Sequence, residues 1–138
     1  AEVIVADSSA IIAIAFGEPE AALFQRLLTE ASDCVCSAVT FTECVMVLIG
    51  KRAATPLREV EALFGDLKVR PAALDPEQGR LAAEAFIRFG KGRHPAGLNL
   101  GDCFSYALAK SLQAPLLYKG EDFARTDIAS ALTAGARP

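Results

Sequence analysis

Short apolar runs alternate with helical patterns along this chain, and that alternation constrains the fold more than any other feature. Val3–Ala6 is a continuous apolar run rich in β-branched residues, which is typical of a strand buried on both faces of a parallel sheet. Pro71 interrupts a later run, which indicates a strand at a sheet edge. The further predicted strands are Cys34–Ala38, Lys68–Leu74 and Pro115–Tyr118, with Ile128–Leu132 as a fifth strand or a short closing turn.

Helical segments lie between these runs. They are predicted at Ala10–Phe16, at Glu20–Ala31, from Thr40 to about Arg52, from Thr55 to Leu67, from Asp75 to about Phe89, and from Asn99 or Gly101 to Leu112. This alternation predicts an α/β fold, with a central parallel sheet of four to five strands and helices on both faces. The chain has 138 residues, of which 52% are apolar, and it carries no linker or repeat. We therefore expect a single domain over residues 1–138.

The composition excludes several classes of protein. The net charge is −3, so any binding of nucleic acid must depend on local groups rather than on a global basic field. No Cys-x-x-Cys pair is present and His94 is the only histidine, so we expect reduced, buried thiols rather than a zinc site. The apolar stretch Val3–Phe16 is interrupted by polar residues and is too short to cross a bilayer. We expect a cytoplasmic protein with no membrane partner.

Four acidic residues stand where an apolar segment ends or turns polar. Asp7 and Asp122 follow predicted strands, whereas Glu43 and Asp102 lie in the first turns of predicted helices. In a parallel sheet, ligands collect beyond the carboxyl ends of the strands, so these four segments can direct acid at one cleft. Clustered carboxylates repel each other unless a cation lies between them, and oxygen-only ligands favour Mg²⁺ or Mn²⁺ over zinc.

Each of these carboxylates also has a structural interpretation. Asp7 could cap the helix that follows it, and Asp122 could cap a short helix begun at Phe123. Thr40-x-x-Glu43 is the pattern of a capping box, and Asp102 could favour the positive end of its helix dipole. Against the capping box, residues 44–49 are apolar on all sides, which predicts a buried helix. A glutamate with no nearby cation is costly at the start of such a helix.

Neighbouring polar residues provide possible support for such a site. Ser9 could orient a water on the cation or serve as a second capping hydroxyl, and Asn99 could hold the start of the Asp102 helix. Glu121 could replace Asp122 as a ligand or be solvated. His94 lies in the Gly-rich loop 90–97, where a general base would be poorly held. Basic side chains could line a phosphate path or be ordinary surface charges; they are Lys51, Arg52, Arg58, Arg88, Lys91, Arg93 and Lys119.

The segments that carry these acids are Val3–Ala10, the Glu43 helix, Asn99–Ala109 and Leu116–Phe123. Together they resemble a PIN domain and, more narrowly, the VapC-type toxins of bacterial toxin–antitoxin pairs. The resemblance implies an Mg²⁺- or Mn²⁺-dependent endoribonuclease, and its acidic quartet maps onto Asp7, Glu43, Asp102 and Asp122. In many family members the last acids form Asp-x-Asp, and here Gly120 occupies the earlier position.

The resemblance also implies a reaction and partners. A water activated by the cation would attack an RNA phosphodiester and leave 5′-phosphate and 3′-hydroxyl ends. The implied partners are tRNA or ribosomal RNA as substrate, a cognate antitoxin protein and a second copy of the chain in a homodimer. Helices Glu20–Ala31 and Thr55–Leu67 could form the antitoxin groove or the dimer face, or could simply pack on the core. Two alternatives stay open, a metal-dependent nuclease with another nucleic-acid substrate and a catalytically inactive PIN-like module that binds a protein.

Overall fold

Four parallel strands form a central sheet in the order β3-β2-β1-β4. The computed structural model describes residues 2–51 and 56–135. The strands are β1 (Val3–Ala6), β2 (Asp33–Ser37), β3 (Val69–Ala72) and β4 (Leu116–Leu117). The strand with Pro71 is therefore an edge strand, as predicted. Because the strands are parallel, the carboxyl ends of all four lie at the same end of the sheet.

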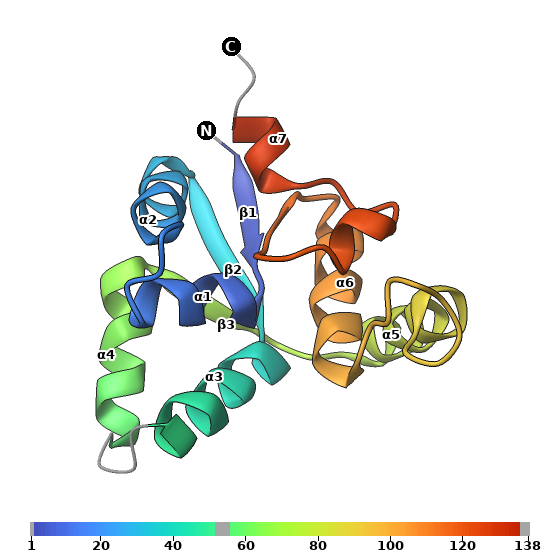
Figure 1. Cartoon of the computed structure of the whole chain (residues 1–138), viewed down its shortest axis with the longest axis horizontal. Helices are drawn as coiled ribbons and strands as arrows, with labels where there is room; N and C mark the ends of the chain where they lie inside the picture. Colours follow the sequence, from blue (N-terminus) through green and yellow to red (C-terminus); the bar gives the residue numbers. More distant parts are fainter. Residues whose placement is uncertain (1, 52–55, 136–138) are drawn as a thin grey trace.

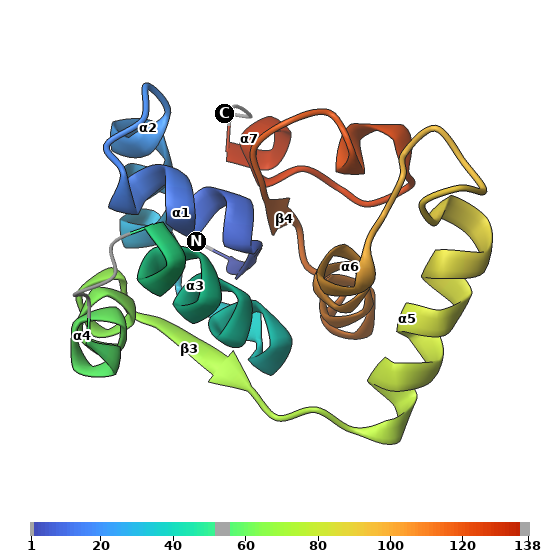
Figure 2. The ribbon, with the colours of Figure 1, turned by 60° about the horizontal axis from the view of Figure 1, so that its bottom comes forward.

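Helices cover both faces of this sheet (Figure 1). One layer consists of α1 (Ser8–Ala15), α2 (Ala21–Glu30), α3 (Ala38–Lys51) and α4 (Leu57–Leu67). After β3 the chain crosses to the other face (Figure 2), where α5 (Pro76–Phe89) and α6 (Leu100–Leu112) form the second layer. A 3-10 turn, η1 (Phe123–Arg125), and the short helix α7 (Ala131–Gly135) follow β4. The predicted α/β architecture is confirmed.

The sheet separates two apolar cores. Alternate residues of a strand point to opposite faces, and accordingly Ile4 packs in the core under α1–α4 while Val5 packs in the core under α5 and α6. This two-sided burial explains why β1 is apolar throughout. The four cysteines are free and buried. In the part of the chain that is described, no helix is both long and apolar enough to span a bilayer.

Several element boundaries differ from those predicted. Helix α1 begins at Ser8 instead of Ala10 because Asp7 caps it, and α3 begins at Ala38 instead of Thr40. Residues 128–132 do not form a fifth strand. Ser130 makes a single parallel bridge to Leu116, and its hydroxyl accepts a hydrogen bond from the backbone N–H of Leu132, so that α7 begins there instead. Arg52 and Thr55, which were expected at helix ends, lie outside the described residues.

The expectation that α3 is buried on all sides is wrong. Only one side of this helix faces the sheet and its neighbours, where Thr40, Cys44 and Leu48 are buried. Met46, on the other side, is 69% exposed. An apolar sequence on every side of α3 therefore reflects one face in the core and a second face that stays open.

Two leucines of α6 provide a matched test of this packing. Leu108 is 1% exposed and Leu112 is 46% exposed. Leu108→Ala leaves a cavity in the core, so it should lower the free energy of unfolding by about 2–5 kcal/mol. Leu112→Ala should cost less than about 1 kcal/mol. Urea unfolding measures both, and equal losses would contradict the described position of α6.

Candidate active site

Asp7 lies at the carboxyl end of β1 and is only 2% exposed. Its Oδ2 accepts hydrogen bonds from the backbone N–H of Ser9 at 3.0 Å and from the Ser9 hydroxyl at 2.7 Å. Its Oδ1 accepts a third bond, from the Ser105 hydroxyl, at 2.6 Å. Burial of a carboxylate is costly unless such hydrogen-bond donors are present. Asp7 therefore caps α1 and is also held in one orientation, so the helix-cap interpretation and a role in a site are compatible.

Ser105 joins three segments that are far apart in the sequence. It reaches Asp7 from α6, and its hydroxyl also lies 3.2 Å from the Thr40 hydroxyl of α3. Both hydroxyl-bearing residues are fully buried. The capping-box interpretation of Thr40 and Glu43 is consequently wrong, because Thr40 lies inside α3 and its hydroxyl meets Ser105. Sequence reasoning missed Ser105, although its spacing of three from Asp102 places both on one side of α6.

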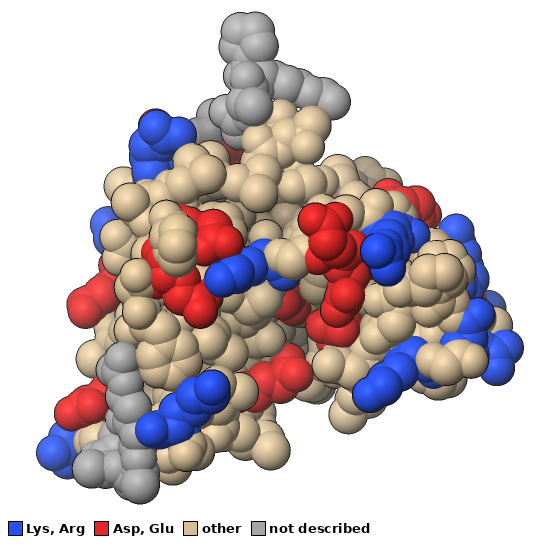
Figure 3. Space-filling view, in the orientation of Figure 1, with Lys and Arg blue, Asp and Glu red and all other residues tan. Residues whose placement is uncertain are grey.

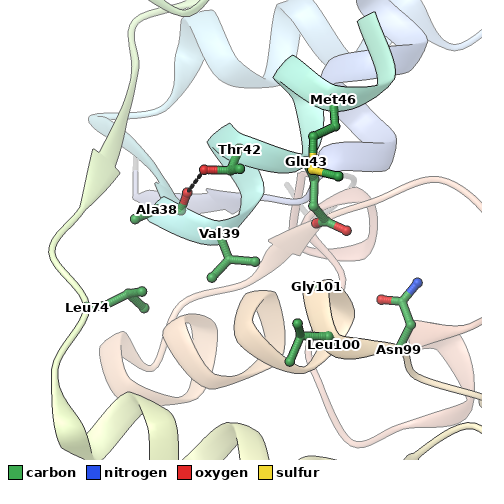
Figure 4. A pocket seen from close by; sticks show the side chains of 9 residues that line it. All are labelled: Ala38, Val39, Thr42, Glu43, Met46, Leu74, Asn99, Leu100 and Gly101. Carbon is green, nitrogen blue, oxygen red and sulfur yellow. Dashed lines mark hydrogen bonds between the residues drawn. The ribbon is translucent and has the colours of Figure 1, made fainter. Parts of the chain in front are cut away.

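Glu43 extends from α3 toward the start of α6 (Figure 4). A Cβ atom at Gly101 would collide with the Glu43 carboxyl group, so this close approach requires glycine. Glu43 Oε1 is buried and has no hydrogen-bond partner among the described residues. Burial, followed by the charges of Asp7 and Asp102, raises the pKa of Glu43 to about 7, and a hydrogen bond with the Ser8 side chain acts in the opposite direction. Sequence reasoning did not assign Gly101 a role beyond a possible helix start, because the contact is formed only by the tertiary fold.

Asp102 lies in the first turn of α6 and forms a capping box with Asn99. The backbone N–H of Asp102 donates to Asn99 Oδ1 at 2.9 Å, and that of Asn99 donates to Asp102 Oδ2 at 3.1 Å. Burial raises the pKa of Asp102 to about 6, and the charges of Asp7 and Asp122 act in the same direction. Asn99 therefore supports the helix start as predicted, and Asp102 is fixed close to Asp7.

Asp122 differs from the other three acids because it is exposed. It precedes η1 but its side chain makes no capping hydrogen bond, so the helix-cap interpretation is wrong for this residue. Its charge acts on Asp102, which places it at the rim of the same site. Glu121 is exposed beside it. Acidic side chains accordingly run down the middle of the face shown in Figure 3.

Ser9 and Lys119 attach the Asp122 loop to the site. The backbone N–H of Lys119 donates to the Ser9 hydroxyl at 3.0 Å, and that hydroxyl donates onward to Asp7. The Lys119 ammonium lies 2.9 Å from Glu18 and 3.5 Å from Glu20. Ser9 is thus a link between Asp7 and the loop after β4, in addition to its backbone capping bond.

The carboxylate oxygens of this site are suitable ligands for a hard divalent cation. Among residues 2–51 and 56–135, no three His, Cys, Asp or Glu side chains are arranged as a complete metal-binding group. Mg²⁺ does not require one, because it binds through one or two carboxylates and keeps several waters. The unpartnered, buried Oε1 of Glu43 is the observation that fits such an ion, since a cation would offset the charge that burial disfavours.

An apolar groove of about 540 Å³ opens beside Glu43. It lies between α3 and the start of α6 (Figure 4), and its exposed apolar side chains include Met46 at 69% and Leu100 at 73%. The remaining lining residues are Ala38, Val39, Thr42, Leu74, Asn99 and Gly101. The open side of α3 described above is one wall of this groove.

A family model described as PIN domain matches residues 4–129. The chain therefore belongs to the PIN-domain family. It is 40% identical over 126 residues to a ribonuclease VapC of Mycolicibacterium smegmatis, covering 91% of this chain and 98% of that one. It is 41% identical to ribonuclease VapC28 of Mycobacterium tuberculosis, covering 93% and 97%. Within the PIN-domain family the chain belongs to the VapC ribonucleases, and the predicted family is confirmed.

Solved structures share the fold at lower identity. VapC20 of Mycobacterium tuberculosis, a Sarcin-Ricin loop cleaving toxin, superposes with a TM-score of 0.69 at 17% identity, over 98% of this chain and 99% of that one. A toxin–antitoxin complex from Klebsiella pneumoniae gives 0.68 at 18% identity, over 90% and 92%. The chain therefore shares its overall fold with both structures.

Gly101→Ala tests the contact between α6 and Glu43. The colliding atoms are the end of a flexible side chain, so we expect Glu43 to move aside rather than the protein to unfold. Displacing a group of an active site by about 1 Å costs on the order of a hundredfold in rate. Gly79→Ala in α5 is the matched control, because a Cβ there meets nothing within 4 Å. The control should keep full ribonuclease activity, and full activity in Gly101→Ala would contradict the contact.

The pH dependence of stability tests the electrostatics of the metal-free site. The pKa of Glu43 is raised from 4.5 to about 7, so this group keeps its proton to a higher pH when folded than when unfolded. The contribution of Glu43 to the free energy of unfolding is therefore fully present below pH 4.5 and is lost as the pH rises through about 7. Urea unfolding in a chelator should show wild type losing stability over this range relative to Glu43→Gln.

The exposed Glu61 of α4 provides the matched control for this pH series. Glu61→Gln should keep the wild-type slope of stability against pH. A wild-type protein that gains stability relative to Glu43→Gln as the pH rises would contradict the burial of Glu43.

Proposed function

We propose that this chain is an endoribonuclease toxin that hydrolyses RNA phosphodiesters with Mg²⁺ or Mn²⁺ held by Asp7, Glu43 and Asp102. The observation that carries the proposal is the buried Oε1 of Glu43, which has no hydrogen-bond partner in the part of the chain that is described and lies where β1, α3 and α6 meet. Its relatives are named ribonucleases, and the acidic side chains of its site offer oxygen atoms as ligands. A divalent cation supplies an acidified water and offsets the negative charge that builds on the phosphate.

The residues around the cation have separate roles in this proposal. Asp7 and Asp102 would bind the cation directly, because each is already held by hydrogen bonds in a fixed orientation. Glu43 would bind it directly or through a water. Asp122 would act from the rim, on the cation's waters or on a second cation, and Glu121 could share that role. Ser9 holds Asp7 and the Asp122 loop in register.

We also propose a cognate antitoxin and a homodimer as partners. The Klebsiella pneumoniae structure is a complex of toxin and antitoxin, which supports a protein inhibitor for this chain. Helices α2 and α4 use Phe24, Leu28 and Phe64 in the core, so packing accounts for much of their apolar character. The groove beside Glu43 leaves apolar side chains exposed at the site itself, which favours a protein contact there. A substrate among tRNA or ribosomal RNA stays a prediction.

Asp102→Asn tests the proposal with little change to the fold. Asparagine keeps an oxygen that can accept the capping bond from Asn99, but it removes the charge that holds a cation. We expect RNA cleavage to fall by about a hundredfold or more, and chelation of divalent ions to abolish wild-type cleavage. Cleavage is measured on matched RNA and DNA oligonucleotides.

Asp66→Asn, at an exposed position of α4, is the matched control and should cleave like wild type. Undiminished cleavage by Asp102→Asn, or by wild type in excess chelator, would refute the mechanism. Absence of both cleavage and Mn²⁺ binding in wild type would favour the inactive binding module instead.

A further inference from the structure

The loop between α5 and α6 carries Lys91 and Arg93, and Arg125 of η1 contacts the same loop. Arg26, Arg70, Arg80 and Arg88 each lie within 4.0 Å of a carboxylate. In the described ranges, by contrast, no ion pair joins Lys91, Arg93 or Arg125 to an acid. Their charges are exposed and close to the loop.

Backbone carbonyl groups hold the two arginines in place. Arg93 Nε donates to the carbonyl oxygen of Ile87 at 3.2 Å, and Arg125 Nη1 donates to that of Pro95 at 3.2 Å. Each guanidinium uses one nitrogen in this way, so the other nitrogens of each planar fork can bind a bidentate anion such as phosphate. A neutral carbonyl positions the fork without cancelling its charge.

The loop itself is fixed by hydrogen bonds. The backbone N–H of Lys91 donates to Leu98 at 2.9 Å, and that of Leu98 donates to Phe89 at 3.0 Å. His94 Nδ1 accepts from the backbone N–H of Ala96 at 3.0 Å, and its ring packs edge-on against Phe89. His94 therefore has a structural role. Because the loop is already ordered, presenting its cations to a ligand costs little conformational entropy.

The three basic side chains lie on segments that adjoin the carboxylate site along the chain. Leu98 ends the loop, and the capping box of Asn99 and Asp102 follows at once. Arg125 is the last residue of η1, which begins immediately after Asp122. The bond from Arg125 to Pro95 thus connects the segment that carries Asp102 with the one that carries Asp122. In Figure 3, basic side chains gather over the α5 side of the molecule, next to the central acids.

We propose that Lys91, Arg93 and Arg125 form a phosphate-binding site for the RNA strand that runs through the carboxylate site. The inference rests on the proposed ribonuclease function. RNA meets a chain of net charge −3 whose reaction site is lined with acids, so local cations must offset the repulsion. The three side chains bind the phosphates flanking the scissile one and thereby position the strand. They act on binding, and the chemical step belongs to the carboxylates.

The salt dependence of RNA binding tests this site. Binding of a single-stranded RNA oligonucleotide is measured in a chelator, which prevents cleavage, in wild type and in the triple variant Lys91→Gln, Arg93→Gln, Arg125→Gln. Each lost phosphate contact lowers the slope of log K against log salt by about 0.7, so the triple variant should lose about 2. The ratio of wild-type to variant affinity should then be roughly 20-fold larger at about 50 mM salt than at about 200 mM.

Two further variants separate charge from structure. Arg70→Gln also removes one positive charge. Arg70 pairs with Asp33 at the start of β2, at the end of the sheet away from the carboxylates, so the slope of log K against log salt should stay at the wild-type value. The double variant Arg93→Lys, Arg125→Lys keeps both charges and should retain most of the slope. A triple variant with the wild-type slope, or one no different from Arg70→Gln, overturns the proposal.

Cleavage kinetics separate failure of this inference from failure of the proposed function. With Mg²⁺ or Mn²⁺, the triple variant should show KM raised by at least about tenfold with kcat nearly unchanged, because uniform binding has been removed. A fall in kcat with unchanged KM overturns the positioning role. A wild-type protein that cleaves no RNA refutes the ribonuclease mechanism, whereas the salt slope still reports whether the three cations contact phosphate.

Discussion

Hydrogen bonds to the buried carboxylate of Asp7 join α1, α3 and α6 to the end of β1. Asp7 is 2% exposed, and the three hydrogen bonds that it accepts from Ser9 and Ser105 offset the cost of burying it. One of these starts α1, and another requires α6 to lie against the end of β1. Through Ser105 and Thr40 the same network reaches α3. Satisfying one buried side chain therefore fixes the relative positions of α1, α3 and α6, of which α3 carries Glu43 and α6 carries Asp102.

Glu43 presents the opposite case. Its Oε1 is buried without a partner among the described residues, and its raised pKa reflects burial together with the charges of Asp7 and Asp102. An unsatisfied charge of this kind is unfavourable in the protein alone and becomes favourable when a cation is bound. The Ser8 side chain hydrogen-bonds the Glu43 carboxyl group, but Oε1 has no partner among the described residues, and we infer that this oxygen is left for a metal ion. A cluster built in this way is ordered before the ion binds but is complete only with it.

The sequence predicted the parts of the fold that depend on local patterns. The bounds of β1 follow from its apolar run, and Asp7 and Asp102 were placed at the edge where parallel strands end. The roles of Ser105 and Gly101 were missed because both come from tertiary contacts. Ser105 bonds to Asp7, which lies 98 residues away in the sequence, and Gly101 contacts Glu43 on another helix. The burial of α3 was misjudged because an apolar sequence does not show which side faces an open groove. The metal and its individual ligands remain predictions.

Anomalous diffraction from crystals soaked in Mn²⁺ would locate the ion relative to these acids. We expect one strong peak within bonding distance of oxygens from both Asp7 and Asp102, with Glu43 bound to the ion or to one of its waters. A map at saturating Mn²⁺ with no peak there, or with the ion bound elsewhere while these carboxylates keep only their protein partners, would contradict it.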